Sequence, residues 1–248
     1  MKLTPIISTH ALVKQFGAVR AVNNVDFEVF PGEIRCLIGP NGAGKSTLFK
    51  CLTHQYRPTS GSVYFAGADV SALPSFQVAR LGIAIKNQIP SVYPNLSVRE
   101  SIWLALRGQG LSRRRASSKV AATLEEIGFT EEMAGMPVGS LSHAHRQWCE
   151  LGMLRASAPR LALLDEPTAG MTSSEMLKTV ELIKLLNKQA TVIVVEHDLD
   201  FIARLAQRVT VFHKGEILAE DTMANIQANE TVRDVYLGRK KEAGDAHS

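Results

Sequence analysis

The stretch GPNGAGKST at residues 39–47 decides how the rest of this sequence is interpreted. It follows a nearly all-apolar run, residues 34–38, and it precedes a helical pattern, LFKCLTHQY. Between a buried strand and a helix, GxxxxGKS is the pattern of a loop whose backbone N–H groups surround phosphates. We expect Lys45 to reach the β- and γ-phosphates of a nucleotide and the Ser46 hydroxyl to bind Mg²⁺. The stretch therefore predicts binding of a nucleoside triphosphate.

A second apolar run, LALLDE at residues 161–166, ends in two adjacent carboxylates. Parallel α/β sheets hold their ligands at the carboxyl ends of their strands. We expect Asp165 to bind Mg²⁺, often through water, and Glu166 to act as the base that polarises an attacking water. The alternative is an ordinary charged turn after a strand.

A histidine, His197, follows a third apolar run, residues 192–195. A single histidine is usually not functional. At the end of a strand, however, an imidazole could contact the γ-phosphate and orient water.

The order of patterns along the chain predicts an α/β fold. Two alternating segments, residues 10–22 and 23–30, indicate half-buried strands, and helical spacing dominates from about residue 96 to residue 155. Beyond Pro159 strands and helices alternate again, which favours a parallel sheet with helices on both faces. We expect the basic run at residues 107–119 to be a solvated loop between two helices, with lipid phosphates or an acidic partner surface as the alternative role.

Composition excludes several classes of protein. The chain has 248 residues, of which 45% are hydrophobic and 21% charged, so a disordered, collagenous or coiled-coil protein is excluded. No apolar run approaches the length of a membrane span, and the first ten residues lack the features of a secretory signal. We therefore expect a soluble cytoplasmic protein. The three cysteines, Cys36, Cys51 and Cys149, lie in apolar segments, and we interpret them as reduced core residues rather than redox or metal sites.

Six motifs in order along the chain resemble the nucleotide-binding subunit of an ATP-binding cassette (ABC) transporter. They are Phe16, GPNGAGKST at 39–47, Gln88, LSHAHRQ at 141–147, LLDEPTAGM at 163–171 and His197. The resemblance implies an α/β P-loop NTPase cassette with a mixed or parallel core sheet, an N-terminal antiparallel β subdomain and a helical subdomain. It would form one domain over residues 6–238, with the helical subdomain at about 96–157, followed by a polar tail at 239–248.

The resemblance also implies a role for each motif. Phe16 would stack on adenine, Gln88 would join Ser46 and Asp165 at Mg²⁺, and Glu166 and His197 would be catalytic. The ATP-binding residues would be Phe16, Gly39, Asn41, Gly42, Ala43, Gly44, Lys45, Ser46 and Thr47, together with Ser142, His143 and Ala144 of the signature loop.

The signature loop departs from the family pattern. It has His143, Ala144 and His145 where the family has two glycines and a glutamine. Our hypothesis is that His143 adds a titratable donor beside the triphosphate, whose negative charge would favour the protonated ring. The alternative is that His143 points away and fills space.

By the same resemblance, two ATPase subunits, in a hetero- or homodimer, would enclose two ATP molecules. They would work with two transmembrane permease subunits and, indirectly, with a periplasmic or extracellular solute-binding protein. The chain would be peripheral on the inner face of the cell membrane, with Ile89, Val92 and Tyr93 lining a groove for the permease. We expect no nucleic-acid partner.

The transported solute is inferred from the particular residues found in and around the motifs. AGMT at residues 169–172 and the closing VRDVYLGR resemble the importers of branched-chain amino acids and their urea-transporting relatives, and AGMT with the LSH opening favours urea. A branched-chain amino acid importer is the alternative. A non-transport cassette ATPase acting on ribosomes or DNA, and a regulatory subunit that binds ATP without useful turnover, are further alternatives.

Overall fold

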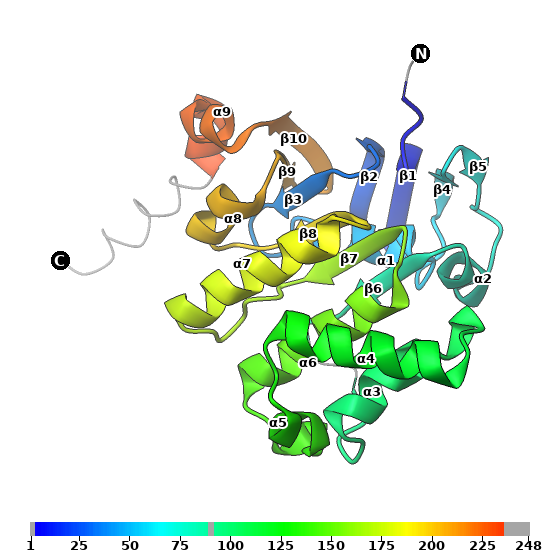
Figure 1. Cartoon of the computed structure of the whole chain (residues 1–248). Coiled ribbons are helices and arrows are strands. Elements are labelled where there is room, and N and C mark those ends of the chain that lie inside the picture. Colours follow the sequence, from blue (N-terminus) through cyan, green and yellow to red (C-terminus); the bar gives the residue numbers. More distant parts are fainter. Residues whose placement is uncertain (1–2, 89–91, 236–248) are drawn as a thin grey trace. The chain divides into compact units, whose positions relative to one another are not determined.

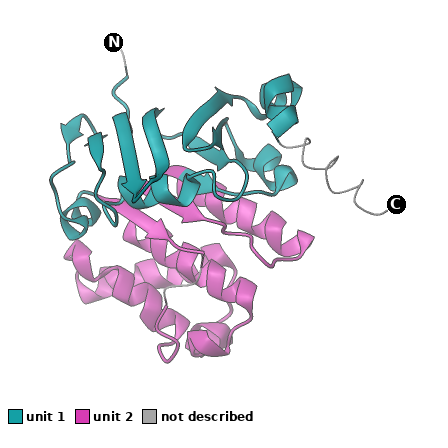
Figure 2. Cartoon of the chain, turned by 180° about the vertical axis from the view of Figure 1, so that it is seen from behind, with its two compact units in different colours: residues 1–81, 193–248 teal, residues 82–192 magenta. Residues whose placement is uncertain are grey.

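A computed structural model describes residues 3–88 and 92–235 of the chain (Figure 1). The chain divides into two compact units (Figure 2). Unit 1 comprises Met1–Leu81 and Ile193–Ser248, and unit 2 is the single segment Gly82–Val192. The predicted tail at 239–248 lies outside the described residues. Over the described ranges, no helix is both long and apolar enough to cross a bilayer.

Unit 1 contains the predicted antiparallel sheet. Its strands, in spatial order, are β2 (Val19–Val29), β1 (Ile7–Phe16), β4 (Ser60–Phe65) and β5 (Ala68–Asp69). Buried and exposed residues alternate along β2 from Val25 to Val29, because one face of the strand is covered and the other is solvated. The boundary between the two alternating segments is wrong, because residues 10–22 include the end of β1, the turn and the start of β2, and residues 23–30 continue β2.

Unit 1 also contains part of a mixed sheet, in the order β10 (Glu216–Asp221), β9 (Arg208–His213), β3 (Ile34–Ile38) and β8 (Thr191–Val195). The chain passes from unit 2 into unit 1 within β8. β3 pairs with β9 in parallel, whereas β9 and β10 are antiparallel. β3 and β8 are buried along their whole length, as their apolar sequences predict. The helices of unit 1 are α1 (Lys45–Leu52), α2 (Ser75–Arg80), α8 (Leu199–Leu205) and α9 (Met223–Ala228).

A charged residue inside β3 is fully enclosed. The guanidinium of Arg35, which is 0% exposed, lies 2.6 Å from Glu33 Oε1 and 2.5 Å from Glu220 Oε2. It also donates to Thr210 Oγ1 on β9 at 2.8 Å. A buried charge is tolerated only when it is paired and hydrogen-bonded, and these contacts satisfy Arg35 across three strands.

Unit 2 combines two parallel strands with helices. The strands are β6 (Ile83–Lys86) and β7 (Leu161–Asp165). The helices are α3 (Val98–Ala105), η1 (Arg107–Gln109), α4 (Arg113–Ile127), α5 (Glu131–Gly135), η2 (Val138–Ser140), α6 (His143–Ser157) and α7 (Ser173–Asn187). The helical patterns of the sequence correspond to α3, α4, α6 and α7, while β6 was not predicted.

The prediction of a solvated loop at residues 107–119 is wrong. A short 3-10 turn is followed by α4, which begins at Arg113 with Ser112 as its cap. Ala116, Val120 and Leu124 are buried at four-residue spacing, so this helix has an apolar face. Three consecutive arginines conceal that spacing at its start.

The three cysteines are buried and unpaired, as predicted. Burial raises the pKa of the Cys51 thiol to about 11 and that of the Cys149 thiol to about 12, and it also raises the pKa of Cys36. All three therefore remain neutral thiols near neutral pH.

The loop at residues 39–47 is pressed against neighbouring backbone. A Cβ on Gly39 would lie 2.2 Å from the carbonyl oxygen of Phe212, and one on Gly44 would lie 2.1 Å from that of Ala21. Both glycines also have positive φ angles, +154° and +108°. Only glycine satisfies both restrictions at these two positions.

Replacing Gly39 with alanine is expected to lower the free energy of unfolding by about 3 kcal/mol or more, because overpacking and backbone strain add. Gly42 is the matched control, since it has a φ of +79° but nothing within 4 Å of an added Cβ. Gly42→Ala should cost only about 1–2 kcal/mol. Urea denaturation followed by circular dichroism measures both changes, and equal losses would contradict the proposed clash.

Candidate functional site

The loop of unit 1 leads into a helix that has no side-chain cap. The N-cap of α1 is Gly44, and no side chain accepts a hydrogen bond from the first turn. The longer helices of unit 2 differ, because α3, α4, α6 and α7 are each capped by a serine or threonine hydroxyl. A helix start without a cap presents amide donors and a partial positive charge, which together suit a phosphate.

The Lys45 ammonium lies against the inside of the same loop. Its Nζ donates to the carbonyl oxygens of Gly39 at 2.7 Å and Pro40 at 3.2 Å, and the residue is only 9% exposed. The next residue, Ser46, is exposed at the start of α1. The loop therefore carries a cation and an accessible hydroxyl beside the amides, as the sequence predicts.

Phe16 and His197 also belong to unit 1. Phe16 ends β1 and is 44% exposed, with its ring centroid 5.3 Å from that of Tyr56 and 4.9 Å from Lys14 Nζ. The His197 side chain is 69% exposed after β8, and its backbone N–H donates to Glu196 Oε2 at 3.1 Å. Both side chains are thus partly exposed to solvent.

In unit 2 the two carboxylates end β7. Asp165 is the last residue of the strand, and Glu166 follows with a φ of +43°, a left-handed backbone that is uncommon outside glycine. Gln88 Nε2 donates to Glu166 Oε2 at 2.7 Å. This bond uses the amide nitrogen of Gln88 and not its amide oxygen. The contact between Gln88 and Mg²⁺ stays a prediction.

The signature loop forms the N-terminus of α6. Ser142 caps the helix by accepting from the backbone N–H of His145, and its Oγ lies 2.7 Å from His145 Nδ1. The His145 ring lies edge-on to Phe129 and Trp148. Burial lowers the pKa of His145, and the nearby charge of Lys178 lowers it further.

His143 bonds within its own chain. Its Nε2 lies 3.0 Å from the carbonyl oxygen of Ala169. A carbonyl only accepts, so Nε2 is the donor in this bond. The predicted contact of His143 with a triphosphate stays a prediction. Ala144 beside it is 3% exposed.

A hydrogen-bonded path links this histidine to Glu166. Ala169, which accepts from His143, donates through its N–H to the Glu166 carbonyl at 3.3 Å. Gln88 donates a hydrogen bond to the side-chain carboxylate of Glu166. Glu166 is therefore positioned through both its backbone and its side chain. Local patterns carry no signal for the contact between His143 and Ala169, because it joins residues 26 positions apart.

Each unit thus gathers its own part of the predicted site. Unit 1 holds Phe16, the loop and His197, and unit 2 holds Gln88, Asp165, Glu166 and the signature residues. Of the expected groove residues, Val92 lines a hollow of about 810 Å³ together with Gln88, His143 and Arg146. Tyr93 is 64% exposed, and Ile89 lies outside the described residues.

Within the described ranges, no cluster of three histidine, cysteine or acidic residues forms a metal site. The predicted Mg²⁺ ligands are one hydroxyl, Ser46 of unit 1, and one carboxylate, Asp165, and one amide, Gln88, of unit 2. By their chemistry, so few oxygen ligands would suit an ion that completes its coordination with phosphate oxygens and water, and this assignment stays a prediction.

The His145 pKa predicts a loss of stability in acid. In the folded protein the pKa of His145 lies below its ordinary value of 6.5, so His145 binds a proton more readily in the unfolded chain. This contribution to stability is complete above about pH 6.5 and decreases as the pH falls toward the folded-state pKa. In His145→Gln this contribution should disappear, so that the melting temperature falls less between about pH 7.5 and about pH 5.5 than in the parent. Parallel pH curves for parent and variant would contradict the assignment.

Comparison with known proteins gives consistent matches. A family model described as "ABC transporter" matches residues 22–169. The high-affinity branched-chain amino acid transport ATP-binding protein LivG of Escherichia coli K12 is 35% identical, with 94% of this chain and 98% of LivG covered. BraF of Pseudomonas aeruginosa, with the same description, is 32% identical over the same shares.

Ribose import ATP-binding protein RbsA 3 of Rubrobacter xylanophilus is 34% identical, but only 48% of its length is covered. Among solved structures, a nucleotide-free ATP-binding cassette from an ABC transporter superposes with a TM-score of 0.83 at 25% identity, covering 94% of this chain and 98% of that one.

Proposed function

Because the chain belongs to the ABC transporter family, whose ATP-binding subunits hydrolyse ATP, we propose that it powers an importer of branched-chain amino acids. The observation that supports ATP hydrolysis most directly is the uncapped phosphate loop of unit 1. Unit 2, taken by itself, holds a carboxylate, Glu166, that Gln88 positions. ATP binding and hydrolysis would drive the membrane partners between their inward and outward states.

Each site residue then has a proposed role. The loop residues Gly39, Asn41, Gly42, Ala43, Gly44, Lys45 and Thr47 bind phosphates, and Phe16 stacks on the adenine. Ser46, Asp165 and Gln88 hold Mg²⁺, which would neutralise phosphate charge. Glu166 accepts a proton from the attacking water, and His197 orients the γ-phosphate. Ser142, His143 and Ala144 face the nucleotide of a second ATPase subunit.

Replacing Glu166 with glutamine is expected to slow ATP hydrolysis by on the order of 10²–10⁴, the usual scale of general-base catalysis. ATP should still bind, because the loop of unit 1 is unchanged. The amide oxygen of the new side chain could still accept from Gln88, so the turn should keep its shape. Single-turnover hydrolysis and equilibrium nucleotide binding measure the two effects.

Glu181→Gln is the matched control, because Glu181 is exposed on α7 and has no place in the proposed site. It should hydrolyse ATP like the parent. Near-parental turnover in Glu166→Gln would remove Glu166 from the role of base.

The proposed partners follow from the family. The chain would dimerise with a second ATPase subunit, of the same or a different sequence, on two permease subunits at the inner face of the cell membrane. A solute-binding protein would act on the opposite side without contacting this chain.

The proposed solute rests on the relatives. LivG and BraF, both described as serving branched-chain amino acid transport, match nearly along their whole length. Urea, which the sequence favoured, has no support from these relatives. It remains a second candidate because of AGMT at 169–172 and the LSH opening of the signature loop. The ATPase subunit does not contact the transported solute, so its sequence indicates a solute only by analogy with its relatives.

Uptake of labelled leucine and labelled urea distinguishes the candidates. In cells lacking this chain, leucine uptake should fall and urea uptake should be unchanged. Complementation with the parent should restore uptake, and Glu166→Gln should not. Loss of urea uptake alone would overturn the branched-chain proposal and keep the importer, while loss of neither would overturn both solutes.

A further inference from the structure

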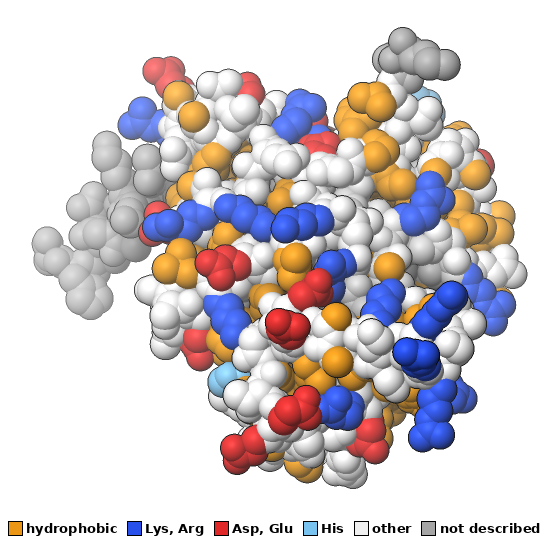
Figure 3. Space-filling model, viewed as in Figure 1, with side chains coloured by type: hydrophobic (Ala, Val, Ile, Leu, Met, Phe, Trp, Pro, Cys, Tyr) orange, Lys and Arg blue, Asp and Glu red, His pale blue; other side chains and the backbone are white. Residues whose placement is uncertain are grey.

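Cationic side chains and a tryptophan gather at the connection between α3 and α4. We name this surface the basic corner and define it as Trp103, Arg107, Arg113, Arg114 and Arg115. All five residues are exposed. Figure 3 shows blue side chains gathered over the N-terminal end of α4, in the lower right of the view.

The basic corner lies in the part of the chain that carries its net positive charge. Residues 101–124 contain five basic residues, Arg107, Arg113, Arg114, Arg115 and Lys119, and no acidic residue. The whole chain has 28 basic and 24 acidic residues, so the remainder has 23 basic and 24 acidic residues and a charge of −1. The excess positive charge is therefore local.

None of the four arginines of the basic corner forms an ion pair with a carboxylate in the part of the chain that the structure describes. Other arginines of unit 2 do form such pairs, since Arg99 contacts Glu131, and Arg155 lies 2.9 Å from Glu126. The guanidinium of Arg107 instead lies 4.9 Å from the centre of the Trp103 ring. The charge of the basic corner is thus not balanced within the fold.

The position of three of these arginines at the N-terminus of α4 is itself unfavourable for the stability of the helix. Arg113, Arg114 and Arg115 occupy its first turn, which contains no acidic residue. Cations are unfavourable beside the positive end of a helix. The first turns of α3, α5 and α7 follow the ordinary preference and contain glutamates. An anion bound at the basic corner would offset the repulsion between the three arginines and the positive end of α4, and would therefore stabilise the first turn of this helix.

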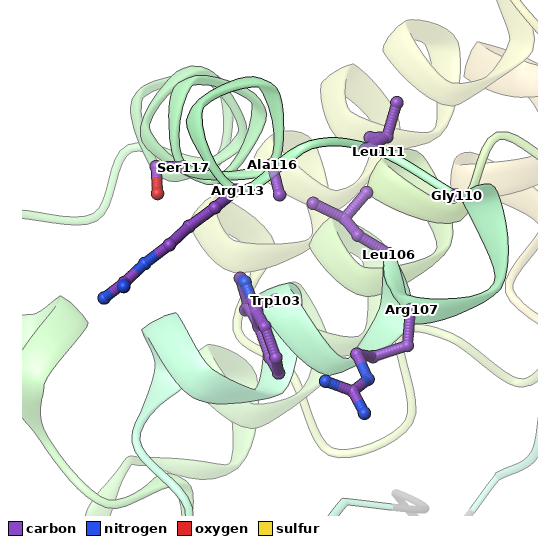
Figure 4. Close-up of a pocket in the computed structure, with 8 residues that line it drawn as sticks. All are labelled: Trp103, Leu106, Arg107, Gly110, Leu111, Arg113, Ala116 and Ser117. Carbon is purple, nitrogen blue, oxygen red and sulfur yellow. The ribbon is translucent and has the colours of Figure 1, made fainter.

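The basic corner borders a hollow lined by both polar and apolar residues. Its volume is about 680 Å³, and its lining includes Leu106, Leu111 and Ala116 as well as Trp103, Arg107 and Arg113. Figure 4 shows Arg113 projecting from α4 on the same side of the hollow as Trp103, with Leu106 and Ala116 between the two helices. A ligand that fits this lining has both a negative charge and an apolar part.

We propose that the basic corner binds the headgroup region of an anionic phospholipid and attaches unit 2 to the bilayer surface. Arginines beside an exposed tryptophan are the combination that binds anionic membrane interfaces. Free phosphate would make no use of the apolar residues of the lining. Surfaces that bind single-stranded nucleic acid offer several aromatic rings on which successive bases stack, whereas the basic corner contains one aromatic residue, Trp103. The proposal does not depend on the solute or on the ATP site.

Vesicle sedimentation tests the proposal with the full chain and no permease. The chain should bind vesicles of phosphatidylcholine mixed with phosphatidylglycerol, and should not bind phosphatidylcholine alone. Because permease is absent, the result is independent of the proposed transport function. Equal binding to both kinds of vesicle, or binding to neither, would overturn the proposal.

The variant Arg113→Gln/Arg114→Gln/Arg115→Gln should bind the anionic vesicles more weakly by on the order of 100-fold, because each arginine near a charged surface contributes to binding. Its melting temperature should be unchanged or raised, since three unfavourable charges leave the start of α4. Weak binding by this variant therefore cannot be attributed to unfolding. The matched control, Lys184→Gln/Lys188→Gln/Arg204→Gln, removes the same charge from exposed positions elsewhere. A similar loss in the control would overturn the assignment of the site.

Two further measurements locate the contact. Brominated lipids in the anionic vesicles should quench the fluorescence of Trp103, and Trp103→Phe, which keeps only the buried Trp148, should lose this quenching. Soluble glycerol phosphate tests the source of the phosphate. If it displaces the chain from vesicles at concentrations where an equal ionic strength of chloride does not, the basic corner is a site for free phosphate and the lipid proposal is wrong.

Discussion

Two carbonyl oxygens, those of Phe212 and Ala21, approach the phosphate loop so closely that positions 39 and 44 have no room for a side chain. Since these oxygens belong to β9 and β2, the loop's shape depends on strands from both sheets of unit 1. The Gly215 N–H adds a hydrogen bond to the Ala43 carbonyl at 2.8 Å. With the backbone fixed in this way, Lys45 turns inward and α1 starts without a cap. The geometry of a local sequence motif thus depends on residues outside it, two of which, Phe212 and Gly215, lie more than 150 positions away along the chain.

The carboxylate of unit 2 is positioned by a different means, which is hydrogen bonding rather than close packing. Gln88 reaches the carboxylate of Glu166, while Ala169 reaches its carbonyl and is itself held by His143. A change at the start of α6 can therefore be transmitted to Glu166 through two hydrogen bonds. This gives the departure from the family's signature pattern a structural meaning within one chain. The histidine joins two loops that a glycine at this position would leave unconnected.

Much of this fold could be predicted because its main signals are local. Apolar runs such as Ile34–Ile38 identify buried strands, and the glycine-rich loop between such a strand and a helix is specific. What could not be predicted depends on tertiary contacts. Arg35 interrupts an apolar strand and becomes acceptable only once Glu33 and Glu220 are brought to it. The start of α4 was missed because Arg113–Arg115 conceal an apolar face that only Ala116 and Val120 continue. The roles of His143 and His145 depend on ring contacts that spacing alone does not reveal.

The division of the chain into units has a consequence for its synthesis. Unit 2 is one continuous segment, and its two ends meet, because Arg160 accepts from the Thr191 N–H and donates to the Gly82 carbonyl. Unit 1 is discontinuous, since its strands β9 and β10 follow unit 2 along the chain. A chain emerging from the ribosome can therefore complete unit 2 before Phe212 has been synthesised. The loop at residues 39–47 is translated early, but its contact with the Phe212 carbonyl can form only after β9 has been made.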